Sequence, residues 1–269
     1  MKISVIIPTY QPGDYFYHCL DSLKNQDFPY HNFEVIIVLN GPRDPYENKI
    51  LDYISSKMTN ISVNFIYSNV SGVSNARNIG IENAMGEYVF FIDDDDLIST
   101  NYLKELYNYK TDDGMVVSNI KTFTHDTSDL SDDYLTKAYT SNISTKFHSF
   151  FKLRSFFTTC WAKLIPKQLI LDSRFDTDIP ISEDSLFMFL LASKMKTINL
   201  CPNSEALYYR RVRSHSVNRK KRPWSFRINL SRKLLTRYTI LYVKQISNYD
   251  FAFYLSRIAG SILTVFKPT

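Results

Sequence analysis

Short apolar runs alternate with helix-like segments over the first 92 residues, and this alternation limits the fold more than any other feature. Residues 3–8, 34–39, 63–67 and 87–92 are short and mostly apolar, as expected of strands buried on both faces. The segments between them carry apolar residues at helical spacing, for example Phe16, Cys19, Leu20 and Leu23. The alternation predicts an α/β fold with a mostly parallel sheet and helices on both faces.

The remainder of the chain is less regular. We expect a helix carrying Leu103 and Leu106, a strand at 115–120, a mobile polar loop at 125–144 and a helix from about residue 183. Two helices are expected near the end. Their predicted apolar faces are Leu234, Tyr238, Leu241 and Tyr242 in the first helix, and Tyr254, Leu255, Ile258 and Ile262 in the second.

Charge divides the chain sharply. Residues 206–269 contain 14 of the 32 Lys and Arg residues but one acid, Asp250, of the 27. A basic segment of this kind favours a phosphate-bearing partner, which can be a nucleotide, a nucleic acid or an anionic membrane.

Cysteine spacing and hydropathy bear on the compartment. Cys19, Cys160 and Cys201 have no paired spacing, which fits a reducing cytoplasm. The apolar start of the chain is too short for a signal peptide, and charged residues interrupt the most apolar stretch, 238–266. We therefore expect no transmembrane helix and a cytoplasmic location.

Four aspartates, Asp93 to Asp96, directly follow the strand at 87–92. Ligands of open α/β sheets bind beyond the carboxyl ends of the strands. Adjacent carboxylates repel one another, and they suit Mg²⁺ or Mn²⁺ bridging a diphosphate. The alternative is a solvated acidic turn in which Asp96 caps a helix.

At this point the sequence resembles family 2 glycosyltransferases, which have the GT-A fold. FIDDDD matches their D-x-D-D motif, and GVSNARNIGIENAMGEYVFFIDDDD is similar to their central signature. ISVIIPTYQ and EVIIVLNG resemble their first two strands, TTCWAKLIPKQLI their acceptor-side segment, and ISEDSLF the segment holding the catalytic base. The resemblance covers residues 3–218.

The resemblance implies an inverting, metal-dependent glycosyltransferase that moves a sugar from a nucleotide-sugar, with UDP as the expected nucleotide. The implied acceptor is a saccharide or lipid-linked saccharide in capsule, lipopolysaccharide or other surface polysaccharide biosynthesis. It also implies a catalytic domain at 1–218, with a donor half to about 120 and an acceptor half at 121–218. Residues 219–269 would form a basic helical tail.

The resemblance also assigns the donor site. The residues it places near the nucleotide or ribose are Pro8, Thr9, Tyr10, Asn40, Arg77, Asn78, Asp93 and Asp94. Asp95 would bind the metal directly. The Leu39-Asn40 pair departs from the commoner Asp-Asp, which affects the expected base contact. A surface position on an amphipathic helix is the alternative for Arg77.

On the acceptor side, Asp184 would be the catalytic base and Glu183 would contact the acceptor. A carboxylate at a helix N-terminus is kept ionised by the helix amides, although Ser182, Glu183 and Asp184 also fit a simple helix cap. Trp161 would stack on an acceptor sugar, with a core tryptophan as the alternative.

The basic C-terminal segment extends the implied site. His215 would be a second metal ligand, unless it is a histidine without a special role, and Arg210, Arg211 and Arg213 would contact the diphosphate. The basic run at 219–222 and the helices after it suit peripheral contact with a membrane. Alternatively, these helices pack on the domain or on a second subunit; the sequence leaves the oligomeric state open.

Two other classes of protein compete with this interpretation. A nucleic-acid-binding protein would use the basic tail, but it leaves the acidic strand end unexplained, so we expect no nucleic-acid partner. A nucleotidyltransferase usually has a Gly- and Lys/Arg-rich loop after the first strand. Here that position holds Tyr10-Gln11-Pro12-Gly13.

Overall fold

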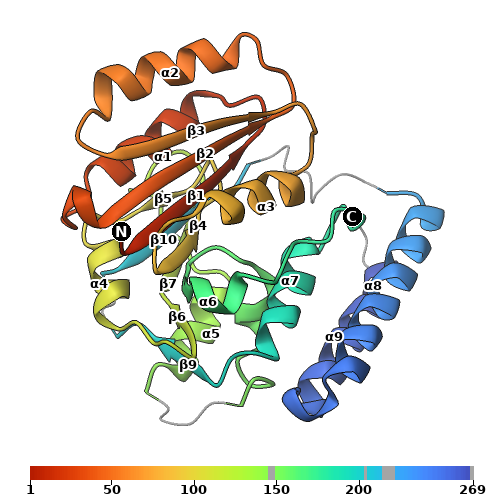
Figure 1. Cartoon of the computed structure of the whole chain (residues 1–269). Coiled ribbons are helices and arrows are strands. Elements are labelled where there is room, and N and C mark those ends of the chain that lie inside the picture. Colours follow the sequence, from red (N-terminus) through yellow and green to blue (C-terminus); the bar gives the residue numbers. More distant parts are fainter. Residues whose placement is uncertain (145–148, 203–204, 214–221, 267–269) are drawn as a thin grey trace.

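Two β-sheets organise the chain in a computed structural model that describes residues 1–144, 149–202, 205–213 and 222–266 (Figure 1). The larger sheet has the strand order β3-β2-β1-β4-β8-β6-β9, and the smaller one has the order β5-β10-β7. Strands β1 to β4 are mutually parallel where they pair, as the sequence predicts.

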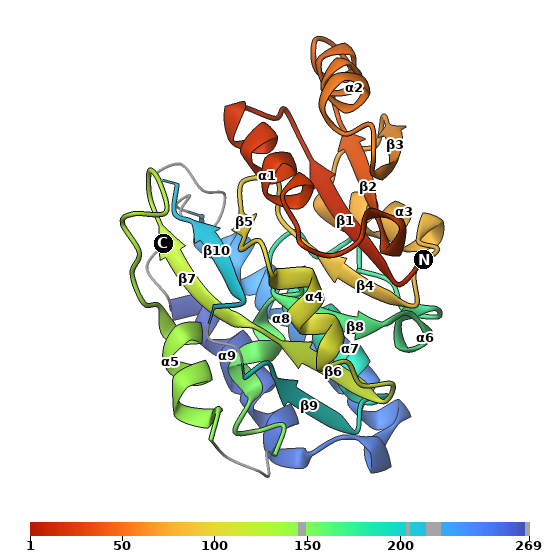
Figure 2. The same ribbon diagram turned by 90° about the vertical axis from the view of Figure 1, so that its left-hand side faces the viewer.

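The parallel part of the large sheet comes from the first 91 residues. Its strands are β1 (Ile3–Thr9), β2 (Phe33–Asn40), β3 (Ser62–Ser68) and β4 (Tyr88–Phe91). Every residue of β1, β2 and β4 is buried, because helices cover both faces. The helices are α1 (Asp14–Lys24), α2 (Tyr46–Lys57) and α3 (Val73–Asn83), with a 3₁₀ turn at Tyr30–Asn32. Figure 2 shows α1 and α3 on opposite faces of β1 and β2.

The sheet changes direction in its second half. β8 (Lys163–Pro166) runs antiparallel to both β4 and β6 (Gly114–Val117), and β9 (Thr197–Leu200) then pairs parallel with β6. The helices of this half are α4 (Tyr102–Asn108), α6 (Lys167–Ile170) and α7 (Glu183–Ala192), with a 3₁₀ turn at Arg154–Thr158.

The expected strand at 115–120 is in fact two strands in different sheets. β6 ends at Val117, and β7 (Asn119–Phe123) joins β10 (Leu207–Arg211) and β5 (Leu97–Ile98) in the small sheet. The chain turns at Ser118, whose backbone N–H donates to the carbonyl of Ala162 and whose hydroxyl bonds Tyr102.

The prediction of a polar loop at 125–144 is wrong for the second half of this segment, which forms the helix α5 (Tyr134–Asn142). Asp133 caps this helix by accepting from the N–H groups of Leu135 and Thr136, and the Thr136 hydroxyl accepts from the N–H of Asp133. A capping box of this kind stabilises a helix that has few apolar residues.

The C-terminal segment forms a helical hairpin of α8 (Trp224–Lys244) and α9 (Phe251–Phe266), joined through a 3₁₀ turn at Ile246–Asn248. Ring contacts pair Trp224 with Phe266 and Tyr242 with Phe251, so the helices are antiparallel. The hairpin packs on α7, where the Tyr238 hydroxyl donates to Ser185 Oγ at 2.9 Å. The packing alternative for the tail is therefore what the structure shows.

The apolar face expected for α9 is only partly covered: Tyr254 and Ile258 pack against the core. Phe253, Arg257 and Ser261 are the buried residues of this helix, whereas Leu255 and Ile262 are exposed. None of the helices in the described ranges is both long enough and apolar enough to span a bilayer.

Candidate functional site

The carboxyl edge of the parallel strands gathers most of the predicted site. β1 ends at Thr9, β2 at Asn40 and β4 at Phe91, and the four aspartates follow β4. Because parallel strands end at one edge, groups that are distant in sequence meet there. The Thr9 hydroxyl donates to Asp94 Oδ2 at 2.6 Å.

The first three aspartates form a dense, partly desolvated negative cluster. Burial, reinforced by the neighbouring carboxylates, raises the pKa of Asp94 to about 7. Burial and the nearby charge of Asp93 raise the pKa of Asp95 to about 6. Asp93 is the most open of the three. The cluster is therefore stabilised by positive charge placed beside it.

Arg213 supplies such a charge in this structure. Its Nε lies 2.5 Å from Asp95 Oδ2, and its guanidinium stacks over the ring of Tyr15. The predicted contact of Arg213 with the diphosphate stays a prediction.

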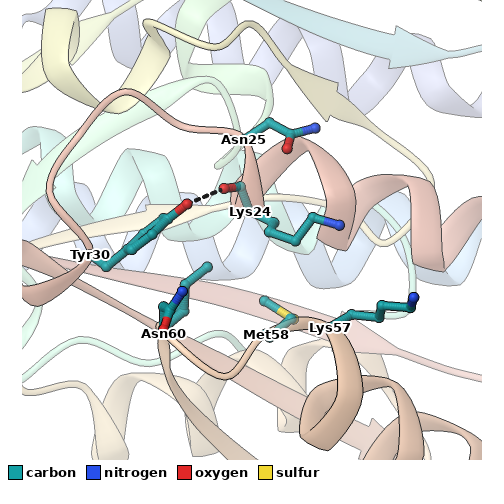
Figure 3. A pocket seen from close by; sticks show the side chains of 7 residues that line it. Lys24, Asn25, Tyr30, Lys57, Met58 and Asn60 are labelled. Atoms are coloured by element: carbon teal, nitrogen blue, oxygen red, sulfur yellow. Dashed lines mark hydrogen bonds between the residues drawn. The ribbon is translucent and has the colours of Figure 1, made fainter.

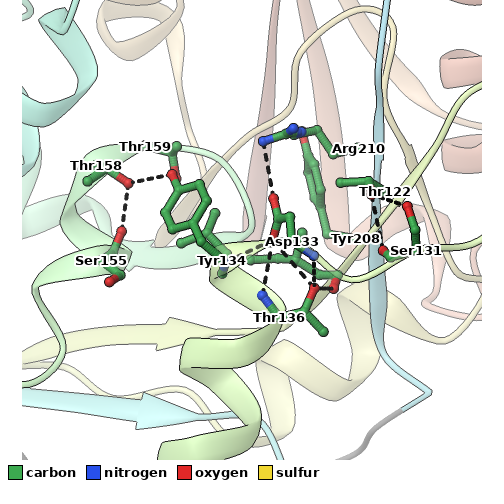
Figure 4. Close-up of polar contacts among 12 residues, drawn as sticks. Thr122, Ser131, Asp133, Tyr134, Thr136, Ser155, Thr158, Thr159, Tyr208 and Arg210 are labelled. Atoms are coloured by element: carbon green, nitrogen blue, oxygen red, sulfur yellow. Dashed lines mark hydrogen bonds and ion pairs between the residues drawn. The ribbon is translucent and has the colours of Figure 1, made fainter. Parts of the chain in front are cut away.

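Arg210 and Arg211 are placed differently from Arg213. Arg211 donates from Nε to the backbone carbonyl of Asp95 at 3.0 Å and lies over Phe123. Arg210 points to the α5 cap, with its Nη1 3.2 Å from Asp133 Oδ2 (Figure 4). Among the three predicted diphosphate contacts, Arg213 is the one whose guanidinium lies against a carboxylate of the cluster. His215 lies outside the described residues.

Asp96 has a structural role that distinguishes it from the first three aspartates. It is 2% exposed, accepts from the Tyr208 hydroxyl at 2.6 Å, and accepts from the backbone N–H of Arg211 at 2.7 Å. Burial, with the charges of Asp95 and Asp93, raises the pKa of Asp96 well above its ordinary value. It fastens β10 to the acidic turn, so the alternative of a helix cap is wrong.

Arg77 connects the acidic cluster to α7. It is 3% exposed, which excludes the surface alternative. Its Nη2 lies 2.9 Å from Asp93 Oδ1, while its Nη1 lies 2.5 Å from Asp184 Oδ1 and 3.3 Å from Glu183 Oε1. Its ring contact is with Phe175. The guanidinium thus joins the predicted donor carboxylate to the predicted base.

Asp184 stands in the first turn of α7, behind Ser182 in a left-handed conformation (φ 69°). Burial raises the pKa of Asp184, while the adjacent charge of Arg77 opposes that shift. Cys160 Sγ donates to Asp184 Oδ1 at 3.5 Å. Burial and the Asp184 charge raise the pKa of Glu183 to about 7. Ser182 makes no side-chain cap bond, so the cap interpretation fails at that residue.

The residues predicted to bind the nucleotide base differ in their exposure and in their contacts. Half of the Tyr10 side chain is exposed, and its ring lies over Gly41, whose φ of 116° favours glycine. Asn40 is buried, donates to the carbonyl of Thr9 at 2.8 Å and accepts from the N–H of Gly72 at 2.9 Å. Asn40 therefore holds two turns together. Pro8 lies inside β1, paired with Val38.

Two predicted contact residues are structural in this conformation. Asn78 exchanges two hydrogen bonds with the backbone of Phe175, at 3.0 and 2.8 Å. Trp161 is 5% exposed and stacks on Tyr208 with a centroid distance of 5.0 Å, so a sugar ring has no room on it. Trp161 thus corresponds to the core alternative.

Three residues of the site were not predicted from the sequence: Tyr208, Cys160 and Lys163. Tyr208 contacts both Asp96 and Trp161, and its only sequence signal is its place in a Tyr-Tyr-Arg-Arg run before Arg213. Lys163 is buried and donates to Thr159 Oγ1 and to the carbonyl of Trp161. Burial lowers the pKa of Lys163 to about 7. It fixes the loop that carries Cys160.

A separate hollow of about 220 Å³ lies at the opposite edge of the sheet (Figure 3). Its lining includes Lys24, Tyr30, Lys57 and Asn60, which come from the chain just before β2 and β3 begin. It therefore lies at the amino edge of these strands, away from the aspartates.

Known proteins share both the sequence pattern and the fold. Residues 4–166 match the sequence model of the family described as Glycosyl transferase family 2. Glycosyltransferase GlyA of Streptococcus pneumoniae is 31% identical over 232 residues, which are 81% of this chain and 32% of GlyA. The chain thus spans about a third of the length of that relative.

Solved structures agree on the fold. S. aureus TarS 1-349 in complex with UDP-GlcNAc superposes with a TM-score of 0.76 at 20% identity, covering 99% of this chain and 73% of that one. The mannosyltransferase PcManGT of Pyrobaculum calidifontis, in complex with GDP-Man and Mn²⁺, gives 0.60 at 14% identity, covering 98% and 75%. The predicted GT-A fold is confirmed. The match of the family model over residues 4–166, more than half of the chain, shows that the chain belongs to glycosyltransferase family 2.

Proposed function

We propose that this protein is an inverting, metal-dependent glycosyltransferase that moves a sugar from a UDP-sugar to a hydroxyl of a saccharide or lipid-linked saccharide. One observation carries the proposal: the Arg77 guanidinium holds Asp93, at the end of β4, and Asp184, at the start of α7, on either side of itself. The residues predicted for donor binding and for proton transfer are therefore adjacent in space.

The donor assignment is supported by relatives. TarS has been solved with UDP and with UDP-GlcNAc, and relatives named for poly(ribitol-phosphate) glycosylation and minor teichoic acid synthesis match this chain. We infer a UDP-linked donor and a role in surface polysaccharide synthesis. The candidate products are capsule, lipopolysaccharide and teichoic-acid-type polymers. Tyr10 offers an exposed ring on which the base can stack.

A divalent cation fits the acidic cluster. Within the described ranges, no three His, Cys, Asp or Glu side chains form a ready metal cluster. However, Asp94 and Asp95 supply the oxygen ligands that Mn²⁺ or Mg²⁺ prefers, and burial raises the pKa of both carboxyl groups although Arg213 lies beside Asp95. Structures of PcManGT and GalNAc-T7 contain Mn²⁺. We assign Asp95 as the direct ligand, Asp93 and Asp94 to the ribose or to metal-bound water, and His215 as a candidate second ligand.

The bound cation would neutralise charge on the leaving diphosphate. Asp184 takes the proton from the acceptor hydroxyl as that oxygen forms its bond to the anomeric carbon. The bond between the anomeric carbon and the diphosphate breaks at the same time, and UDP leaves with the electron pair. The charge of Arg77 lowers the pKa of Asp184 and so opposes the effect of burial, and Arg213 can move from Asp95 to the diphosphate. Glu183 lies beside the base, where we assign it to acceptor contact.

We place the reaction in the cytoplasm, at the inner face of the membrane when the acceptor is lipid-linked. Cys19, Cys160 and Cys201 are buried and have no paired spacing in the sequence, in keeping with a reducing compartment. We retain the proposed division into a donor half to about 120, an acceptor half at 121–218 and a tail at 219–269.

The test is a panel of UDP-sugars incubated with saccharide and lipid-linked acceptors in the presence of Mn²⁺ or Mg²⁺. The proposal predicts acceptor-dependent release of UDP that stops when the metal is chelated. Formation of pyrophosphate from a nucleoside triphosphate and a sugar phosphate would instead identify a nucleotidyltransferase.

A further inference from the structure

The outer face of α9 carries no charge. The only charged residue between Phe251 and Phe266 is Arg257, and it is buried against the domain, where it donates to Ser185 Oγ at 3.0 Å and to the carbonyl of Arg154. The exposed large side chains of this helix are Phe251, Leu255, Ile262, Leu263 and Phe266. A helix of this composition is unusual on a protein surface that faces only water.

Exposed apolar side chains also occur on α8. The exposed apolar residues of α8 and of the turn after it are Trp224, Ile228, Ile240, Val243 and Ile246. The ring contacts of Trp224 with Phe266 and of Tyr242 with Phe251 join the two helices at both ends of the hairpin. We call these exposed apolar side chains of α8, α9 and their connecting turn the hairpin face.

Basic residues accompany the hairpin face. Residues 222–266 include seven Lys and Arg residues and a single acid, Asp250. Arg232, Lys233 and Lys244 are exposed on α8. Apolar side chains combined with cations match a surface that is itself apolar and anionic.

A second copy of this chain fits less well. A symmetric dimer brings the same patch of both subunits together, so cations on α8 would face cations. The hairpin has one acid with which to pair them. An anionic bilayer offers both hydrocarbon and negative headgroups.

We propose that the hairpin face lies on the surface of an anionic phospholipid bilayer, with α9 in the plane of the interface. α9 has 16 residues and is about 24 Å long, which is short of the roughly 30 Å hydrocarbon thickness, so it lies on the bilayer. Membrane contact is thus assigned to the exposed apolar side of α9, which carries Leu255, Ile262 and Leu263.

Membrane contact would also orient the site. Arg237 of α8 pairs with Asp176 at 2.7 Å, and Lys233 donates to the carbonyl of Asp178 at 3.1 Å. These acids belong to the loop that leads into Asp184. In Figure 1, the end of the hairpin where α8 begins points to the same side as the carboxyl ends of the strands. The hairpin face would therefore hold the acceptor side of the domain near a lipid-linked substrate.

The experiment is cosedimentation of the full chain with phosphatidylcholine vesicles, with or without phosphatidylglycerol. No sugar transfer is measured, so the outcome is independent of the proposed function. We expect binding to the vesicles that contain phosphatidylglycerol, weaker binding to pure phosphatidylcholine, and loss of binding as salt is raised.

The decisive variant is Leu255→Ser/Ile262→Ser/Leu263→Ser, which should reduce vesicle partitioning at least ~10-fold. The matched control is Leu51→Ser/Val70→Ser/Leu171→Ser, which changes exposed apolar residues outside the tail and should bind as the wild type does. Arg232→Glu/Lys244→Glu should weaken binding by about fivefold or more per residue. Circular dichroism and UDP binding check that each variant is folded.

Equal sedimentation of the wild type and the α9 variant would overturn the proposal, as would no binding to either vesicle. The proposal would also fail if the wild type were a dimer in solution that the α9 variant converts to a monomer, because the hairpin face would then bind a second copy.

Discussion

The two ends of the acidic run differ in the groups that hold them. Asp93 and Asp95 face guanidinium groups, those of Arg77 and Arg213, whereas Asp96 faces the Tyr208 hydroxyl and a backbone N–H. A guanidinium on a long side chain can be exchanged for a bound cation, but a backbone N–H within a sheet cannot leave. We therefore propose that the first aspartates bind the ligand and that the fourth stabilises the fold.

The largest expected effect tests the catalytic side of that comparison. Asp184→Asn should lower kcat by about 10²–10⁴-fold, because it removes the group that accepts the proton. UDP affinity should be unchanged, since Asp184 reaches the donor carboxylate only through Arg77. Steady-state kinetics and calorimetric UDP titration measure the two quantities. Turnover close to the wild-type rate would assign the proton transfer to another residue.

The variant Asp96→Ala tests the structural role of the fourth aspartate. It leaves the Tyr208 hydroxyl and the Arg211 N–H without their partner, at a cost of about 2–4 kcal/mol in the free energy of unfolding. Thermal denaturation should show a Tm lower by about 5–15 °C. Asp93→Ala is the matched comparison. It relieves repulsion and leaves Arg77 paired with Asp184 and Glu183, so its Tm should change less while its activity is lost. Equal destabilisation by both variants would remove the distinction.

The pH dependence of the Tm tests the effect of burial on Glu183, the first residue of α7. Burial raises the pKa of Glu183 from 4.5 to about 7, so between these values the folded state binds a proton more tightly than the unfolded state does. The contribution of Glu183 to stability is therefore present at low pH and lost as pH rises through 7. Glu183→Gln cannot ionise, so at pH 8 its Tm should exceed that of the wild type, and the advantage should vanish near pH 5. A Tm difference that does not vary with pH would contradict this.

Tyr208→Phe is expected to have the smallest effect. It removes one hydrogen bond to Asp96 but keeps the ring that stacks on Trp161, so the free energy of unfolding should fall by about 1 kcal/mol. UDP affinity should be retained. Urea denaturation measures the first quantity, and a loss of UDP binding would show that Asp96 and its partner belong to the donor site.

Sequence patterns predict the parallel part of the sheet because continuous apolar runs have few other interpretations. These patterns do not predict the structure where polar residues are buried or where a helix lacks a clear apolar face. Ser118 is completely buried although it separates two strands, and α5 depends on the Asp133 cap more than on an apolar face. In α9, eleven of the sixteen residues are apolar, so periodicity defines the inner side poorly, and the buried Arg257 could not be anticipated.

The parts of the candidate site that lie within short sequence motifs could be predicted. The acidic run and the α7 start are visible in the sequence, and the structure brings them together. Their link through Arg77 spans 107 positions in the chain, which no local pattern reveals. Likewise, Trp161 fits a sugar platform by residue type, but Tyr208 from a distant strand covers its ring.

The most direct test of the account is UDP affinity measured with and without Mn²⁺ in the wild type, Asp95→Asn and Asp96→Asn. We predict that Mn²⁺ strengthens UDP binding in the wild type and in any folded Asp96→Asn protein, and that Asp95→Asn loses this strengthening. If Asp95→Asn responds to Mn²⁺ as the wild type does, the acidic cluster does not hold the cation and the assignment of the donor site is wrong.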